Sequence, residues 1–296
     1  MEEREKNGEE ELSPADQLLE KAARSMTGTP PLEGGPPVCG VDLGTASIIL
    51  AAVDSAGEPI ACEMQPCRVA QDGLVVDYTG AIAITRRLKE KLESRLGRRI
   101  IDAAIAVPPG TNKANTGTHR HVTMGAGFEV LAVADEPVAA NMVLGIQNGV
   151  VVDIGGGTTG LSIFREGEVI YSADEPTGGT HVSLVLQGRY GFNYEQAEAY
   201  KMDPANVRDV AGAVLPVIEK MATIVERHIK GHEVSEAWLV GGTSCLPGIE
   251  RVFSRILGIP SYKPHHPMLV TPLGIAYCGL EARKRMAPQK EPEGLR

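Results

Sequence analysis

A chain of 296 residues with 43% hydrophobic residues is long enough to bury the cores of two domains, and only 4% aromatic residues make those cores aliphatic. The formal charge is −9 and no run of five basic residues occurs, which excludes nucleic acid as an expected partner. No apolar stretch reaches the ~20 residues of a membrane span, and the acidic N-terminus lacks the apolar core of a secretory signal. The five cysteines form no C-x-x-C pair, which indicates reduced thiols in a cytoplasmic protein.

The start of the chain differs in composition from the rest. Residues 1–11 are densely charged and are expected to be disordered. Ser13 and Pro14 are typical of a helix start, and an apolar stripe follows through residues 14–27. A helix this short needs a partner surface, which is either an assembly partner or the chain's own domain, and the sequence favours the second or a disordered tail. Residues 29–37 have the composition of a Pro/Gly linker.

The folded part is expected to begin at Val38 with a strand that leads into Asp42, Gly44 and Thr45. Glycine lets the backbone come close to a ligand, and successive exposed N–H groups form an anion site. A second apolar run covers residues 48–53. The pattern therefore predicts a β-hairpin whose turn carries an acidic residue and a hydroxyl residue.

Helices and strands alternate after this hairpin. Helices are expected at 85–96, 112–125 and 136–145, and strands at 100–107 and 128–133. Acidic residues in the first turn of a helix complement the helix dipole. For Glu136, at the start of the third helix, a capping role therefore stays open beside a catalytic one.

The hairpin pattern returns at residues 150–159. An apolar, β-branched strand leads into Asp153, and a second run covers residues 161–164. Between them stand three glycines and two threonines, Gly155, Gly156, Gly157, Thr158 and Thr159. One Gly-rich turn is a weak signal, but its repetition indicates an internal duplication of one supersecondary unit. Two such loops facing each other would hold a polyphosphate from both sides.

A third glycine motif follows near the C-terminus. A helix is expected at 216–230 with Pro216 in its first turn, and a strand at 237–240 comes after it. The strand leads into Gly241, Gly242 and Thr243.

These three motifs, in this order, resemble the ATPase superfamily of actin, the DnaK-type heat-shock chaperones and the sugar kinases. Two connecting helices of that superfamily are matched by residues 135–140 and 271–276. The resemblance implies an α/β fold of two related actin-like, ribonuclease H-like domains, with mixed sheets flanked by helices and an ATP cleft between them. It divides the chain into a tail (1–37), a first domain (38–148), a second domain (149–283) whose last helix can cross back to the first, and a C-terminal tail (284–296).

The resemblance also implies ATP or ADP and Mg²⁺ as ligands. Asp42 and Asp153 would hold the ion through its waters, and Glu136 would orient the attacking water. Glu198 and Lys201, on one helix face, match a pair beside the nucleoside, although an exposed ion pair explains their spacing equally well. The other implied nucleotide contacts are Gly44, Thr45, Gly155, Gly156, Gly157, Thr158, Thr159, Gly178, Gly179, Gly241, Gly242 and Thr243.

Two features of the superfamily are missing from the sequence. No lysine can be assigned to the position that the chaperones place near the γ-phosphate, and no aspartate matches the hydroxyl-activating base of the sugar kinases. Hydrolysis of bound ATP is therefore expected to be slow.

Several stretches resemble one branch, the chaperone-like family encoded with bacterial ethanolamine-utilisation genes; they are residues 107–111, 171–179, 219–222 and 227–229. That family implies a cytoplasmic protein associated with a bacterial microcompartment. It would assist assembly or reactivate the ethanolamine lyase, with that enzyme or a shell protein as partner. Two alternatives remain open, an actin-like filament ATPase and a small-molecule kinase, and the missing aspartate weighs against the kinase.

Overall fold

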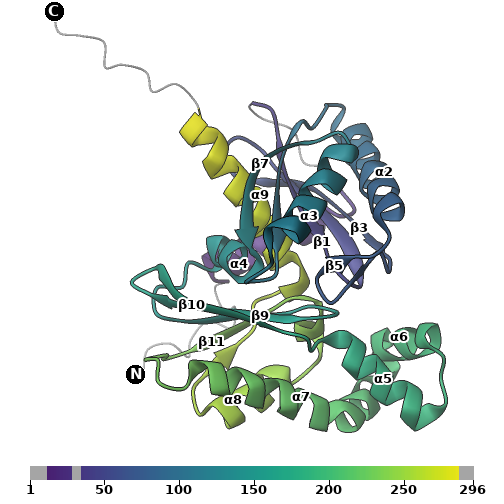
Figure 1. The fold of residues 1–296 in the computed structure, drawn as a ribbon, viewed down its shortest axis with the longest axis vertical. Helices are drawn as coiled ribbons and strands as arrows, with labels where there is room; N and C mark the ends of the chain where they lie inside the picture. Colours follow the sequence, from purple (N-terminus) through teal and green to yellow (C-terminus); the bar gives the residue numbers. More distant parts are fainter. Residues whose placement is uncertain (1–11, 29–34, 287–296) are drawn as a thin grey trace, which may run out of the picture.

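The computed structural model describes residues 12–28 and 35–286, and the predictions made for residues 1–11, 29–34 and 287–296 lie outside the described residues. Two five-stranded mixed sheets form the framework, with strand orders β3-β2-β1-β6-β7 and β10-β9-β8-β11-β12. In each sheet the first three strands in sequence pair as an antiparallel meander, and the remaining two strands are added in parallel. This repeated topology, with one half above the other in Figure 1, confirms the predicted fold class.

The first half is built on β1 and its neighbours. Its strands are β1 (Val38–Leu43), β2 (Ser47–Val53), β3 (Pro59–Pro66), β6 (Asp102–Val107) and β7 (Glu129–Asp135), with a small hairpin of β4 (Ala70–Gln71) and β5 (Leu74–Val75). Helices α2 (Tyr78–Leu96) and α3 (Lys113–Gly125) cover one face of the sheet. Leu88 and Leu92 of α2 and Val122 of α3 are fully buried there, because their helical spacing places them against the sheet.

The second half repeats this plan. Its strands are β8 (Gly149–Ile154), β9 (Thr159–Arg165), β10 (Glu168–Glu175), β11 (Ala237–Val240) and β12 (Ser261–Tyr262). Its outer face is covered by α5 (Gly179–Tyr190), α6 (Tyr194–Met202), α7 (Val207–Ile229) and α8 (Ile249–Leu257), with 3₁₀ turns η1 (Pro204–Asn206) and η2 (Gly242–Cys245). These helices lie together at the bottom of Figure 1.

Two helices lie between the sheets. They are α4 (Glu136–Leu144) and α9 (Pro267–Met286), which pack on each other. Their core contains Ile49 of the first sheet and Val151 of the second, so one hydrophobic cluster joins the two halves. Helix α9 packs on β1, β2, β6 and β7 and ends three residues beyond the predicted domain limit at 283.

The N-terminal helix α1 (Pro14–Arg24) folds back on the body of the chain. Ser13 caps it as expected, and its apolar stripe packs beside β3, α4 and α9, where Leu19 is 0% exposed. Arg95 holds the end of this segment through a 2.7 Å hydrogen bond to the carbonyl of Gly28. The apolar stripe is therefore satisfied within the chain, and docking of this helix on an assembly partner is not supported.

Helix α7 is longer than predicted. It begins at Val207, so Pro216 lies in its interior and not in its first turn. Val210 and Val214 are buried on the same stripe as Ile218, which lets packing override the helix-breaking tendency of proline. Within residues 12–28 and 35–286, no helix combines the length and the hydropathy needed to cross a lipid bilayer.

Candidate nucleotide site in the cleft

The two predicted phosphate loops face each other across the cleft. The first connects β1 to β2 and the second connects β8 to β9. They approach so closely that a Cβ on Gly157 would lie 2.7 Å from Thr45 Oγ1, and a Cβ on Gly156 would lie 3.2 Å from the amide nitrogen of Ala46. A Cβ on Gly157 would collide with the opposite loop and a Cβ on Gly156 would be crowded by it, so glycine at both positions allows the close approach. The fold thus brings together residues far apart in the sequence.

Hydroxyl and glycine residues around the second loop fix its shape. Thr159 donates its hydroxyl to the carbonyl of Thr177 at 2.7 Å, and Thr243 donates to the carbonyl of Gly155 at 2.8 Å. The hydroxyl of Thr159, which the sequence predicts as a phosphate donor, is therefore bonded within the protein, and so is the hydroxyl of Thr243, a predicted nucleotide contact. Gly178 packs on the same loop, since a Cβ there would lie 2.7 Å from the Gly155 carbonyl oxygen. Gly178 supports the loop by allowing this close approach.

Three carboxylates of the predicted catalytic set converge on the cleft. Burial, reinforced by the charge of Asp153, raises the pKa of Asp42 to about 7. Burial also raises the pKa of Asp153 to about 6. The pKa of Glu136 is raised well above its ordinary value by burial and then by the charges of Asp153 and Asp42. The three groups lie close enough to disfavour one another's charged forms, although they come from three different elements.

The cleft holds several negative side chains close together, with Asp153 buried and Asp42 and Glu136 partly buried, and a divalent cation could offset their charges. Asp42 and Asp153 are the residues that would hold Mg²⁺, and their oxygens are the ligand type that this ion prefers. Among the described residues, however, no three His, Cys, Asp or Glu side chains are arranged to ligate a metal directly. That Asp42 and Asp153 hold the ion through its own waters and through phosphate stays a prediction of the sequence.

A fourth carboxylate, Asp174, joins this group from β10. It pairs with Gly160 of β9, which also pairs with Asp153 of β8, so the two aspartates stand in one row on one face of the sheet. Burial raises the pKa of Asp174 to about 6, although a hydrogen bond from Thr158 opposes the shift. Its Oδ1 is buried without a hydrogen-bond partner among the described residues.

The predicted pair on α6 lies in a local polar cluster. Lys201 Nζ is 2.7 Å from Glu198 Oε1 and 3.0 Å from the hydroxyl of Ser183. The lysine side chain is 14% exposed, so the pair is not the exposed ion pair of the alternative interpretation. One helical turn earlier, the Tyr194 ring is covered by the guanidinium of Arg68, 4.1 Å from the ring centroid. Arg68 belongs to the first half, so this contact spans the cleft.

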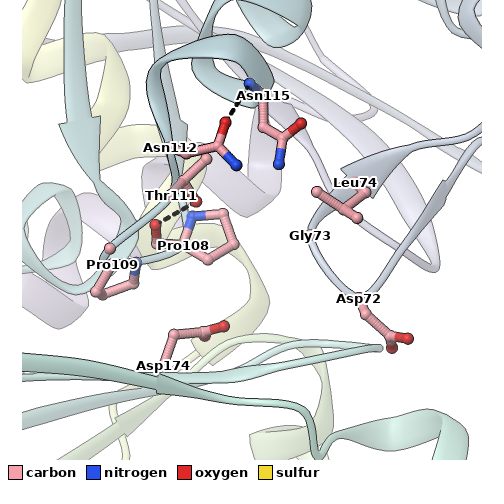
Figure 2. Close-up of a pocket in the computed structure, with 10 residues that line it drawn as sticks. Asp72, Gly73, Leu74, Pro108, Pro109, Thr111, Asn112, Asn115 and Asp174 are labelled. Atoms are coloured by element: carbon pink, nitrogen blue, oxygen red, sulfur yellow. Dashed lines mark hydrogen bonds between the residues drawn. The ribbon is translucent and has the colours of Figure 1, made fainter.

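A pocket of about 230 Å³ opens beside Asp174. Figure 2 shows it between the β4–β5 turn with Asp72 and the start of α3, where the Asn115 side chain extends toward the interior of the pocket. Asp174 forms its floor in this view. The lining is Asp72, Gly73, Leu74, Pro108, Pro109, Gly110, Thr111, Asn112, Asn115 and Asp174.

Sequence reasoning missed Asp174, the contact between Arg68 and Tyr194, and the β4–β5 turn at Asp72. Strand alternation puts Asp174 and Glu175 on opposite faces of β10, but only the pairing of β10 with β9 shows which one faces the cleft. Arg68 lies in a loop whose position depends on tertiary contacts. No local pattern could have placed it against Tyr194.

Comparisons with known proteins identify the family and the fold. A family model described as Hsp70 protein matches residues 77–183, and one described as Type IV pilus assembly protein PilM matches residues 139–268. The ethanolamine utilization protein EutJ of Salmonella typhimurium is 42% identical over 262 residues, which cover 88% of this chain and 92% of that protein.

Solved structures give the same result. The crystal structure of ethanolamine utilization protein EutJ from Carboxydothermus hydrogenoformans superposes with a TM-score of 0.85 at 47% identity, covering 90% of this chain and 98% of that one. MreB 5 of Spiroplasma citri, bound to AMPPNP, has a TM-score of 0.68 at 16% identity and covers 86% and 99%, which shows the fold alone. The chain therefore belongs to the EutJ family of ethanolamine utilization proteins and has the fold shared by actin-like and Hsp70-type ATPases.

Proposed function

We propose that this protein binds ATP and ADP with Mg²⁺ in the cleft and hydrolyses ATP slowly. The observation that carries the proposal is the convergence of Asp42, Asp153 and Glu136 beside two glycine loops that face each other. Main-chain N–H groups of the loops, including that of Thr158, and the hydroxyl of Thr45 would receive the phosphates. The ion would neutralise phosphate charge and offset the repulsion among the carboxylates.

The electrostatics around Glu136 make water activation depend on the charge in the cleft. A carboxylate orients an attacking water by accepting a hydrogen bond, which requires its charged form. Burial and the charges of Asp153 and Asp42 raise the pKa of Glu136 and oppose that form. Positive charge in the cleft would lower this pKa and favour the ionised form, so water activation would be strengthened by a bound cation.

Calorimetry tests nucleotide binding directly. ATP and ADP are titrated with Mg²⁺ and again with EDTA, using wild type, Asp153→Asn and the control Asp54→Asn. Asp54 is also a buried aspartate, but it lies in the turn that follows β2. Its Oδ1 accepts hydrogen bonds from two main-chain N–H groups of that turn. We expect Mg²⁺-dependent binding that Asp153→Asn weakens and Asp54→Asn leaves unchanged. Absence of heat at millimolar nucleotide would refute the proposal.

We further propose that the protein serves ethanolamine utilisation as a chaperone or as an assembly or reactivation factor, with the ethanolamine lyase or a microcompartment shell protein as client. The EutJ relatives support the process, and the Hsp70 family match supports a chaperone-type ATPase. A pull-down from cells grown on ethanolamine tests this role, with and without ATP. If neither the lyase nor a shell protein is recovered, with or without ATP, the proposed role is contradicted.

One observation favours a small-molecule kinase as a second candidate. The pocket beside Asp174 lies next to the row that contains Asp153, and it is lined by carboxylate and amide groups able to bind a small amino alcohol. Asp174 would take the proton of an acceptor hydroxyl while that oxygen attacks the γ-phosphorus and ADP leaves. Incubation with ATP and 2-aminoethanol followed by ³¹P NMR decides the point. A phosphate monoester signal that disappears in Asp174→Asn supports the kinase, and its absence excludes 2-aminoethanol as acceptor.

A further inference from the structure

One turn of α9 touches all three elements that carry the cleft carboxylates. Asp42 is on β1, Asp153 is on β8 and Glu136 opens α4. These elements are far apart in the sequence, and their side chains must keep a fixed spacing to share one ion and one water. Residues 271–274 of α9 are positioned to provide that spacing.

The contact to β8 is a hydrogen bond. Thr271 donates its hydroxyl to Asp153 Oδ2 at 2.5 Å, and both side chains are buried, at 3% and 6% exposure. The other oxygen, Oδ1, lies against Gly241, where a Cβ would come within 2.3 Å of it. The carboxylate is thus held on both sides, and Thr271 is the side chain that supplies the donor.

The contacts to β1 and α4 are close backbone approaches. A Cβ on Gly40, two residues before Asp42, would lie 2.1 Å from the carbonyl oxygen of Pro272. A Cβ on Gly274 would lie 1.9 Å from the carbonyl oxygen of Ala139, in the first turn of α4 after Glu136. Packing this tight leaves little freedom for β1, α4 and α9 to shift relative to one another.

We infer that the turn 271–274 of α9 fixes the three carboxylates relative to one another, and that Thr271 is the positioning residue that ties Asp153 into this arrangement. The hydroxyl of Thr271 is bonded to Asp153, so its effect on a bound nucleotide would be indirect. It acts through Asp153, and it links that strand to a helix whose remaining length packs on the first sheet. The effect of Thr271 on nucleotide affinity rests on the proposed function. Its effect on how firmly α9 is held to β8 does not.

Hydrogen exchange in the protein without nucleotide tests whether Thr271 holds α9 to β8. Thr271→Val keeps the side-chain shape and removes the hydroxyl, and Thr271→Ser restores the hydroxyl. Thr85→Val is the matched control, because Thr85 is a buried helical threonine whose hydroxyl donates to Ala81 of its own helix. We expect amide exchange in β8 and in the first turns of α4 and α9 to rise at least about tenfold in Thr271→Val, and to return toward wild type in Thr271→Ser. Equal exchange in Thr271→Val and Thr85→Val overturns the inference.

Calorimetry then separates positioning from general damage. We expect Thr271→Val to weaken ADP binding about tenfold or more with Mg²⁺ and to leave binding in EDTA within about twofold of wild type, with rescue by Thr271→Ser. Equal weakening with and without Mg²⁺ would show a general structural effect and would overturn the positioning role. If wild type binds no nucleotide, the proposed function fails, and the exchange experiment still decides whether Thr271 joins α9 to β8.

Discussion

The carboxylates of the cleft should destabilise the nucleotide-free protein, and Asp42→Asn at the partly buried Asp42 is the clearest test. Burial and the charge of Asp153 raise the pKa of Asp42 from 3.8 to about 7. The folded state therefore holds a proton that the unfolded state has lost, so stability is highest below the unfolded pKa and falls as the pH rises toward 7. At about 1.4 kcal/mol for each unit, the ionised group costs up to about 4 kcal/mol above pH 7, and relaxation of the site would reduce this to about 2 kcal/mol.

Asparagine has nearly the same shape and no charge, so Asp42→Asn should recover most of this free energy at pH 8 and little at pH 4. Urea unfolding followed by circular dichroism at both pH values measures the difference. Asp54→Asn serves as the control, because Asp54 lies in a turn outside the cleft and its Oδ1 accepts two main-chain hydrogen bonds. Mg-ADP should stabilise wild type more than Asp42→Asn. A loss of stability in Asp42→Asn at pH 8, or an unchanged pH dependence, would refute the electrostatic reasoning.

Three further results are expected. Glu136→Gln should lower the ATP turnover rate at least about tenfold and change nucleotide affinity little, as single-turnover and equilibrium measurements would show; equal losses in both would favour the capping role. Arg68→Ala should speed release of a fluorescent ADP analogue about two- to fivefold in stopped flow, because an exposed cation–π contact with Tyr194 contributes about 0.5–1 kcal/mol to cleft closure. Leu19→Ala should cost about 2–4 kcal/mol in urea unfolding, since Leu19 is fully buried on the body of the chain; an unchanged midpoint would contradict the packing of α1.

The sequence predicted the elements that carry their own local signals. Asn112 caps α3, and Gly97 and Gly145 terminate α2 and α4 in the left-handed conformation, so those ends fall within a residue of the expected positions. These signals are local because a cap or a stop depends only on neighbouring main-chain groups. The start of α7 has no such local signal. Its extension back to Val207 depends on burial of Val210 and Val214, which only the packed structure shows.

The site divides in the same way. The glycines and aspartates of the two loops were identified from the sequence, because a tight turn after a buried strand restricts the residue types at each position. Residue type alone does not determine the role of each hydroxyl. Thr159 and Thr243 have the residue type of phosphate donors, yet both hydroxyls bond to carbonyls within the protein. The hydrogen-bond partner of a hydroxyl depends on which segment packs against it, and the sequence alone does not show that.

By itself, the sequence determined that this protein consists of two copies of one hairpin-based unit with acidic residues at the strand ends, because that pattern is written in consecutive residues. Tertiary structure alone decided which distant groups meet. It placed Asp174 in one row with Asp153, set Thr271 on that same carboxylate, and brought Arg68 across the cleft to Tyr194. Such contacts depend on sheet register and helix packing, which arise from the summed burial of many side chains, and no single stretch of sequence encodes them.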